Sequence, residues 1–487
     1  MAKSLADGLK NSQNCLGVFF KQFTWITAAT SILAAMPILG GATLYESIAL
    51  WITMLPQITF GWGVWAVLLR DQDRSMLNLL AVSLVLGPVT FALVILILVS
   101  CGVSTSRLLV ATVLTSLGVV GVVAMVRSHR QGKRIQFSSQ TDIYVLILAS
   151  IVALIATQRL WMAVDLPGAI ADWGTIGGDA GVEEARANSI MTLGLNDYLL
   201  AHGQPLKYHL LGHVWSGAMS VATQSGPFVV TTRVVPLLTI MGALLLSWVW
   251  VRSIARKDAP ALIAVLFLST TGIAVSLLGP IYSPSFSQSW GVAVGALFVA
   301  AWWAGIQGSI KYRWIVVGVA GFALALAKVN AVVLVAAASL GSLVLLTRSS
   351  ERNTRTFVVS LIASGSALVA VWLYAFGYEN DLVISLSQTA QYLRVSSIAG
   401  TELPYLFPTI MAAALILSPW SASANLVASA SPLRPQVVAL GASLTVLSLG
   451  STVLMGQAGQ SQVYSSMIAG IVMIPLAAWG TWVAWKW

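Results

Sequence analysis

The sequence predicts an all-α polytopic membrane protein with about fourteen transmembrane helices. Of its 487 residues, 57% are hydrophobic and only 9% are charged, and the mean hydropathy is +0.86. Soluble domains carry about 25% charged residues, so this composition excludes an ordinary soluble fold. Its apolar runs approach the roughly 20 residues that span a bilayer as a helix. They lack the polar–apolar alternation of membrane β-strands, which leaves helices as the spanning element.

Fourteen apolar runs are candidate spans, and each is expected to form one helix. They are 24–43, 47–69, 76–100, 106–126, 141–162, 226–252, 260–279, 288–307, 313–327, 331–347, 357–377, 404–420, 436–455 and 462–484. The runs 313–327 and 331–347 are short, since fifteen helical residues reach only about 22 Å against a hydrocarbon core of about 30 Å. The "KVN" turn between them is therefore expected below the outer surface, inside protein or a wet cavity.

The net charge of +10 is explained by membrane topology and indicates no nucleic-acid partner. Basic residues cluster in the connections on one side, chiefly in 3–21, 127–134, 252–257, 311–313 and 348–355. The positive-inside rule makes this side cytoplasmic. Both termini are then cytoplasmic, and the long loops 163–225 and 378–403 face outside. We therefore expect a multi-pass protein of the plasma (inner) membrane whose chemistry lies on the outer face.

Two parts are expected along the chain. Residues 1–140 form an N-terminal module of four spans with short outer loops and little polar chemistry. Residues 141–487 hold ten spans and both long outer loops. No repeat relates the two halves, so the inverted-repeat pattern of many transporters is missing.

Acidic residues gather in the loop 163–225, although the rest of the chain avoids charge. The loop holds six of the 16 acids: Asp165, Asp172, Asp179, Glu183, Glu184 and Asp197. Within it, "DAGVEEARANSIMTLGL" predicts an amphipathic helix that Asp179 could cap. The stretch "LKYHLLGHVWSGAMSVA" predicts a second helix lying at the membrane interface. The alternative without a functional role is that the acids only keep a loop solvated.

Three basic features accompany the acids. Lys328 lies in the "KVN" turn, where an ionisable residue is a functional candidate unless its long side chain snorkels to the surface. Arg233 lies about two turns into the next span, where it could contact a ligand or pair with a loop acid. His209 and His213 share one helix face. Their spacing can bind zinc, but "HLLGH" lacks the acid of HExxH and a third ligand, so packing or a hydrogen bond to phosphate is favoured.

In their order and common sidedness, these motifs resemble those of the GT-C-fold glycosyltransferases of bacterial envelopes. The resemblance is carried by an outer-face Asp after a span, a helical stretch, "GQPLKYH", an Arg early in the next span, and a hairpin with "LALAKVN". It covers about 141–347. It implies a GT-C-like core that transfers a sugar from a polyprenyl-phosphate-linked donor to a hydroxyl of an envelope glycan or lipid acceptor on the outer face. The chain departs from many members in its four leading spans, its lack of a sizeable soluble C-terminal domain, and its lack of a paired-acid motif.

The resemblance gives the polar residues expected roles. Sugar transfer needs a base for the acceptor hydroxyl, and Asp179 is the first candidate because two glycines precede it and a helix follows. Asp172 is the second candidate, and Asp165, Glu183 and Glu184 remain open. The leaving phosphate needs cations or donors, which Lys328, Arg233, Lys207 and His209 could supply. Further contacts, including those to the acceptor, are expected from Glu183, His213, Asn330 and Arg394. No metal site and no cofactor is identified, and a divalent metal has no supporting motif.

Two other functions remain open on the sequence. A glycan polymerase or ligase of another fold would rely on outer-loop arginines, of which the two long loops offer only Arg186 and Arg394. A transporter or flippase of lipid-linked glycans would favour internal repeats and broken helices with charges near the bilayer centre. The sequence offers one such turn, "KVN", and no repeat.

Overall fold

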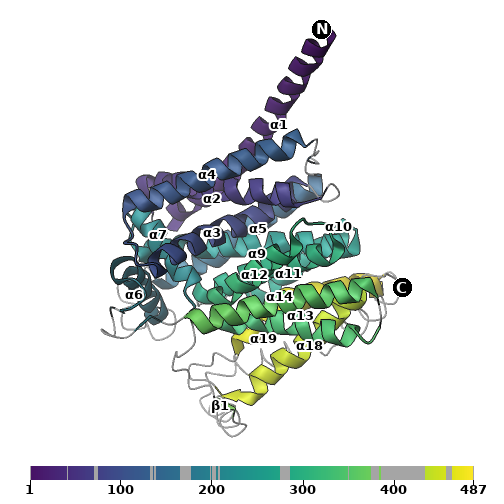
Figure 1. The fold of residues 1–487 in the computed structure, drawn as a ribbon. Helices are drawn as coiled ribbons and strands as arrows, with labels where there is room; N and C mark the ends of the chain where they lie inside the picture. The colour runs from purple at the N-terminus through teal and green to yellow at the C-terminus, as the bar shows by residue number, and fades with distance from the viewer. Residues whose placement is uncertain are drawn as a thin grey trace.

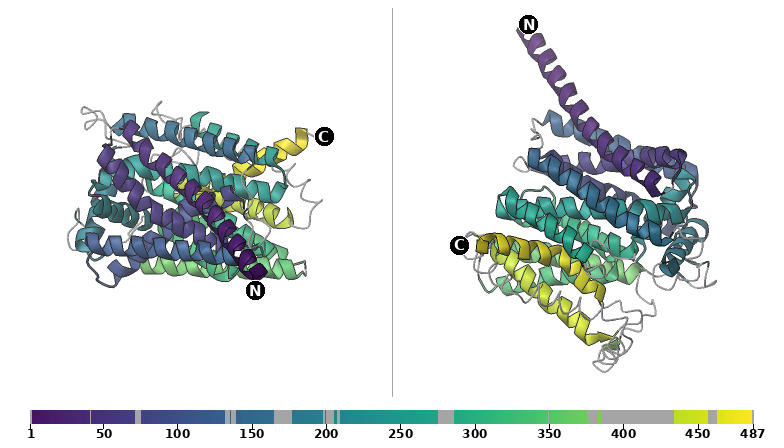
Figure 2. Two further views of the ribbon diagram at one scale, coloured as in Figure 1. Left: turned by 90° about the horizontal axis from the view of Figure 1, so that it is seen from above. Right: turned by 180° about the vertical axis from the view of Figure 1, so that it is seen from behind.

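Helices make up nearly all of the described structure and lie side by side in one bundle (Figure 1). The computed structural model describes residues 2–40, 42–70, 75–131, 135, 139–164, 177–197, 199, 205–206, 209–274, 286–348, 350–374, 383–384, 434–456 and 463–485. α6 lies at one end of the bundle, and the N-terminal part of α1 projects away from it (Figures 1 and 2).

The helices follow one another in the order that the apolar runs predict. The N-terminal part holds α1 (Ala2–Ala35), the 3-10 turn η1 (Met36–Gly40), α2 (Leu44–Leu68), α3 (Met76–Ser100), α4 (Arg107–Arg130) and α5 (Gln140–Val164). The middle holds α6 (Gly177–Leu193), α7 (Leu211–Thr223), α8 (Pro227–Val229), the π-helical turn η2 (Val230–Val234), α9 (Val235–Ala255) and α10 (Asp258–Ala274). The remainder holds α11 (Phe286–Gln307), α12 (Arg313–Ala327), the 3-10 turn η3 (Val329–Ala331), α13 (Val332–Leu345), α14 (Glu351–Tyr374), α18 (Arg434–Leu454) and α19 (Val463–Trp485). Two-residue strands, β1 (Val383–Ile384) and β2 (Met455–Gly456), pair antiparallel.

The prediction of an all-α multi-pass membrane protein is confirmed. Every expected span overlaps a helix except 404–420, which lies outside the described residues. Eight helices of the described part are long and apolar enough to cross a membrane, and α10, α12, α13, α18 and α19 supply shorter apolar stretches. The count of about fourteen spans, the GT-C-like core and the division at residue 140 stay predictions.

Glycines let the helices of the N-terminal part approach one another closely. A Cβ at Gly63 of α2 would collide with the carbonyl of Gly121 in α4, and one at Gly87 of α3 would collide with the carbonyl of Gln57 in α2. Small residues at such crossings maximise backbone packing, which replaces the hydrophobic effect between helices in lipid. α2 is therefore fixed between α3 and α4 by contacts that no larger residue permits.

The expected break at "KVN" is present. α12 ends at Ala327, Lys328 is extended with φ −161° and ψ 121°, and η3 leads into α13. The backbone N–H of Lys328 donates to the carbonyl of Leu324 at 3.1 Å, and its carbonyl accepts from the N–H of Ala331 at 2.9 Å. The broken backbone is satisfied within the protein, as a turn inside a membrane bundle requires.

Two expectations for the loop 163–225 need correction. α7 does not lie on the surface, because Leu211 to Met219 are buried throughout. Its glycines explain this: a Cβ at Gly212 would lie 2.7 Å from the ring of Trp290, so helix and ring are in direct contact. α6 begins at Gly177, so Asp179 lies within its first turn and is not its N-cap.

Candidate functional site

Five elements position the site: α6, which lies at one end of the bundle (Figure 1), α7, α11, α12 and the turn η3. α6 packs against α7, and α7 packs against α11 and α12. The turn η3 also packs against α11. A Cβ at Gly291 of α11 would lie 2.8 Å from the Cβ of Lys328, so this glycine lets the turn sit directly on α11. The arrangement brings residues 183, 209, 287 and 328 into one buried region.

Lys328 is the buried cation of this region. Its side chain is only 4% exposed, and its Nζ donates to Oγ of Ser287 at 3.0 Å. The same Nζ lies 3.3 Å from Nε2 of His209. An ammonium group can only donate, so His209 accepts through Nε2 and carries its own proton on Nδ1. Snorkelling, the bland alternative for Lys328, does not describe this side chain, because both partners lie in the protein interior.

His209 is buried and is held in its neutral form. Burial lowers the pKa of His209 well below its ordinary 6.5, and the nearby charges of Lys328, His213 and Arg186 lower it further. Desolvation and like charge both disfavour the imidazolium. A neutral ring agrees with its role as acceptor from Lys328.

Glu183 and His213 form a buried hydrogen-bonded pair between α6 and α7. Oε2 of Glu183 lies 2.9 Å from Nδ1 of His213, and both side chains are almost fully buried. Burial alone would raise the pKa of Glu183, but the charge and hydrogen bond of His213 and the charges of Arg186 and Lys328 outweigh it, so the pKa is lowered below 4.5. The carboxylate is therefore ionised at neutral pH.

The Lys328–His209 pair and the Glu183–His213 pair meet where the two histidine rings stack. The ring centroids of His209 and His213 are 6.3 Å apart, with an interplanar angle of 26°. Ser287, Lys328, His209, His213 and Glu183 thus form one connected set, called here the buried polar cluster. It has a cation at one end and a carboxylate at the other, so it can hold an anion near Lys328 while orienting an imidazole through Glu183.

Aromatic side chains link α7, which carries His213, to α11, which carries Ser287. The rings of Trp215 and Trp290 pack edge to face with centroids 5.4 Å apart. Nε1 of Trp215 donates to Oε1 of Gln57 at 2.9 Å, and Nε2 of Gln57 donates to the carbonyl of Thr53 at 2.9 Å. α2, in the N-terminal part, is therefore hydrogen-bonded to the helix that carries His213.

The structure unites several of the residues expected at the site. Lys328 contacts His209, and His213 contacts Glu183. Arg233 is buried in the π-helical turn η2, which packs against both α6 and α7. Single π-helical turns inside helices occur often at functional sites.

The remaining expected residues are described only in part. Asn330 is half-buried in η3, two residues after Lys328. Position 179 lies one turn before Glu183 on α6 and therefore shares its face, but the side chain of Asp179 is outside the described part. Asp172, Lys207 and Arg394 lie outside the described residues, and so does Asp165.

Two contributors were not predicted as site residues. Ser287 receives the hydrogen bond of Lys328, and Arg186 shifts the pKa of both Glu183 and His209. The signal for Ser287 was the polar run "SPSFSQSW" where a span begins, and that for Arg186 was its spacing of three residues from Glu183 on a helix. In the described ranges, no group of three or more His, Cys, Asp or Glu side chains is placed to hold a metal ion.

Comparisons with known proteins add no relative. No protein-family model matches this chain, and searches of the curated proteins and of the solved structures found no match either. The likeness to GT-C glycosyltransferases rests on the motifs of the sequence.

Proposed function

We propose that this protein is a membrane glycosyltransferase that takes a sugar from a polyprenyl-phosphate-linked donor. The observation that carries the proposal is the buried Lys328, held by Ser287 and His209 beside the Glu183–His213 pair. A polyprenyl phosphate leaving group gains negative charge as the sugar departs, and fixed cations and donors in a dry site stabilise that charge strongly. The acceptor we propose is a hydroxyl of an envelope glycan or lipid.

The donor phosphate would lie near Lys328. The ammonium group supplies the charge, and neutral His209 keeps that group oriented while its Nδ1–H remains a donor. Arg233, in a turn that packs on α6 and α7, is proposed as a second cation for the same phosphate. Lys207 stays a candidate on the sequence motif alone.

The acceptor hydroxyl would lose its proton to Asp179. Glu183 already accepts a hydrogen bond from His213, and its lowered pKa makes it a weak base. Position 179 lies one helical turn away on the same face of α6. In the proposed step, the acceptor oxygen forms a bond to the anomeric carbon, the bond from that carbon to the phosphate oxygen breaks, and the phosphate leaves with the electron pair. Asp179 takes the hydroxyl proton, and Asp172 is the alternative base.

The site is proposed to face the outside of the plasma membrane. The basic connections cluster at the opposite ends of the helices, which the positive-inside rule makes cytoplasmic. In a chain whose two cysteines are first replaced by serine, Ile135→Cys should react with a membrane-impermeant maleimide only after the cells are opened. Labelling of intact cells at position 135 would reverse the topology.

The function is tested by incubating the purified protein in detergent with a panel of polyprenyl-phosphate sugars. We expect one donor to bind and to release polyprenyl phosphate when an acceptor is present. Detergent removes the barrier between two compartments, so a flippase would give no product. Lys328→Met should weaken binding of that donor at least about tenfold, as loss of one charge-assisted contact requires, whereas Lys257→Met, at an exposed lysine, should not. Failure to bind any donor, or equal binding by Lys328→Met, would refute the proposal.

A further inference from the structure

A second polar site lies at the opposite end of the bundle from the buried polar cluster. A cavity of about 520 Å³ opens where α13 ends and α14 and α18 begin. Its lining is rich in arginine and comprises Leu345, Arg348, Ser350, Glu351, Arg352, Asn353, Arg355, Pro435 and Gln436. Three arginines against one glutamate leave the lining with a net charge of +2.

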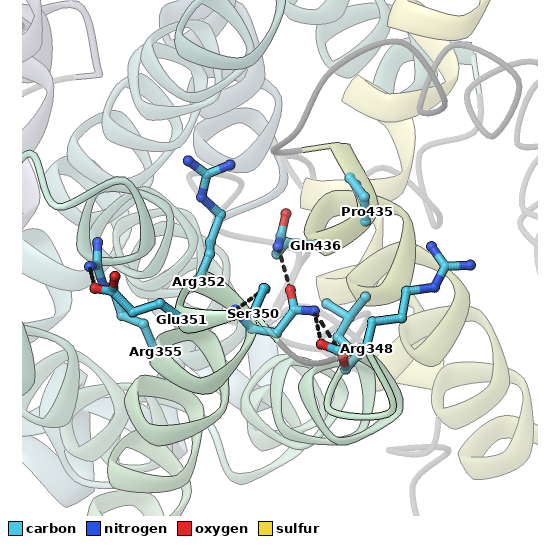
Figure 3. A pocket seen from close by; sticks show the side chains of 9 residues that line it. Arg348, Ser350, Glu351, Arg352, Arg355, Pro435 and Gln436 are labelled. Atoms are coloured by element: carbon cyan, nitrogen blue, oxygen red, sulfur yellow. Dashed lines mark hydrogen bonds and ion pairs between the residues drawn. The ribbon is translucent and has the colours of Figure 1, made fainter.

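One of the three arginines of this cavity is paired with its glutamate. Arg355 donates to Oε1 of Glu351 at 2.6 Å, so that pair is internally neutral. Figure 3 shows the guanidinium groups of Arg348 and Arg352 on either side of Gln436, while Arg355 is turned toward Glu351. Arg348 and Arg352 bring two further cationic side chains to the lining around Gln436.

The backbone around this cavity favours an anionic ligand electrostatically. Nδ2 of Asn353 donates to the carbonyls of Leu345 and Arg348, at 2.9 and 2.7 Å. The carbonyl of Leu345 also accepts from the backbone N–H of Arg348 at 3.1 Å, so the C-terminal end of α13 presents less negative charge to the cavity. The N-termini of two long helices, α14 and α18, open on the same cavity and add the positive ends of their dipoles.

The buried side-chain amide of Gln436 is independent evidence for a ligand. Its side chain is only 3% exposed, and its Nε2 donates to Oδ1 of Asn353 at 3.0 Å. Its Oε1 is buried without a hydrogen-bond partner in the described part of the chain, although a buried acceptor normally has one. In Figure 3 the oxygen of Gln436 is on the side of its amide opposite the dashed hydrogen bond. A ligand with a hydroxyl beside its anionic group would satisfy it.

We propose that this cavity binds a phosphate group next to a hydroxyl, as in the head group of an anionic phospholipid. Arg348 and Arg352 would bind the phosphate oxygens, since a guanidinium matches phosphate geometry. Gln436 would accept a hydrogen bond from the head-group hydroxyl. Leu345 and Pro435 give the cavity an apolar wall, which suits the glycerol backbone of a lipid rather than a free ion.

The site is distinct from the proposed transferase site and does not depend on it. In the proposed topology it lies on the cytoplasmic leaflet, whose anionic lipids attract basic groups close to the membrane. Clustered arginines in loops are usually only topology signals. The cavity, the occupied carbonyls of α13 and the unpartnered oxygen of Gln436 distinguish this cluster from those.

The test measures lipid binding by the purified full-length protein in neutral detergent. Three probes are compared by native mass spectrometry and thermal shift: short-chain phosphatidylglycerol, short-chain phosphatidylcholine and inorganic phosphate. We expect phosphatidylglycerol to bind and raise the melting temperature, and phosphatidylcholine not to. Inorganic phosphate should bind more weakly and compete. Phosphate binding as tight as that of the anionic lipid would instead assign the site to a soluble phosphate compound.

Variants separate this cavity from general surface charge. The double variant Arg348→Gln/Arg352→Gln should bind phosphatidylglycerol at least about tenfold more weakly, because it loses the charge-assisted contacts. The matched control Lys257→Gln/Lys311→Gln removes two cations from connections at the same end of the bundle and should bind normally. If the double variant unfolds without lipid, Arg348→Gln alone replaces it, because Arg348 is exposed. Equal loss in variant and control, or no loss in the Arg348 variants, overturns the proposal.

Discussion

Gly291 and Lys328 are packed so closely that no methyl group fits between them. A Cβ at Gly291 would lie 2.8 Å from the Cβ of Lys328, which is the stiff base of that side chain and not its flexible end. One turn later on α11, a Cβ at Gly295 would lie 2.8 Å from Cδ1 of Leu334, which is the movable tip of a leucine. Two glycines on one helix therefore offer a matched comparison.

Gly291→Ala should displace Lys328 and weaken donor binding, while Gly295→Ala should leave donor binding nearly normal. Both substitutions add one methyl group to the same helix, and overpacking of this kind costs about 1–3 kcal/mol. We expect at least about a tenfold loss of donor affinity for Gly291→Ala only. The measurement is donor binding by the two purified variants, with melting temperature as the control for folding. Equal donor affinities of the two variants would show that Lys328 does not contribute to donor binding.

Asp179→Asn should remove sugar transfer without removing donor binding. Asparagine has nearly the same shape but cannot take a proton, and loss of acid–base catalysis costs at least about a hundredfold. Position 179 lies in the first turn of α6, so the lost interaction of its charge with the helix dipole costs only about 0.3–1 kcal/mol. Transfer rate, donor affinity and melting temperature are measured on the same preparation. Near-normal transfer would assign the base to Asp172.

Glu183→Gln should destabilise the protein strongly, while Glu184→Gln should not. Glu183 is buried against His213, and loss of a buried hydrogen bond to a charged group costs about 1.5–3 kcal/mol. Glutamine can still accept the hydrogen bond from Nδ1 of His213, so we expect the lower end of that range. Its neighbour Glu184 is half-buried, and substitutions away from such pairs stay within about 0.5 kcal/mol. Comparable melting temperatures of the two variants would show that the Glu183–His213 pair contributes little.

Stability should fall as the pH is lowered below about 6.5, the ordinary pKa of histidine. The pKa of His209 is lowered in the folded protein, first by burial and then by Lys328, so only the unfolded chain takes up its proton in this range. Stability from this group is present above about pH 6.5 and is lost on acidification, by at most about 1.4 kcal/mol at pH 5.5. Glu183, whose pKa is lowered below 4.5, acts only at more acidic pH.

The histidine responsible can be identified by substitution. His209→Gln should show a smaller fall in melting temperature between pH 7.5 and 5.5 than the parent protein. An unchanged pH response of His209→Gln would mean that another group titrates in this range.

The helices of this protein could be predicted because lipid leaves the backbone no alternative. Apolar runs must satisfy their own N–H and C=O groups, so each run forms a helix and each short run marks a break. The break at Lys328 followed from run length alone, while its depth below the outer membrane surface stays a prediction. The grouping of Lys328 with His209 followed from the expected sidedness of the two residues.

The pairing within the site could not be predicted, because it depends on how helices rotate and pack. Nothing in the sequence says that Glu183 faces α7 or that Ser287 lies under Lys328. The surface position expected for α7 was wrong for the same reason. Tyr, Trp and His are typical of an interface, but Gly212 and Gly217 let the helix pack inside the protein.

The hydrogen bond between Gln57 and Trp215 has a consequence for how the chain can change over generations. Gln57 is fully buried, and both ends of its amide are used, by Trp215 and by the carbonyl of Thr53. Substitution of either residue alone leaves a buried polar group unsatisfied, at about 1–3 kcal/mol, whereas joint replacement by apolar residues can be nearly neutral. Positions 57 and 215 are therefore expected to vary together among descendants of this sequence. A change in α2 at position 57 would then be accompanied by a change in α7 at position 215.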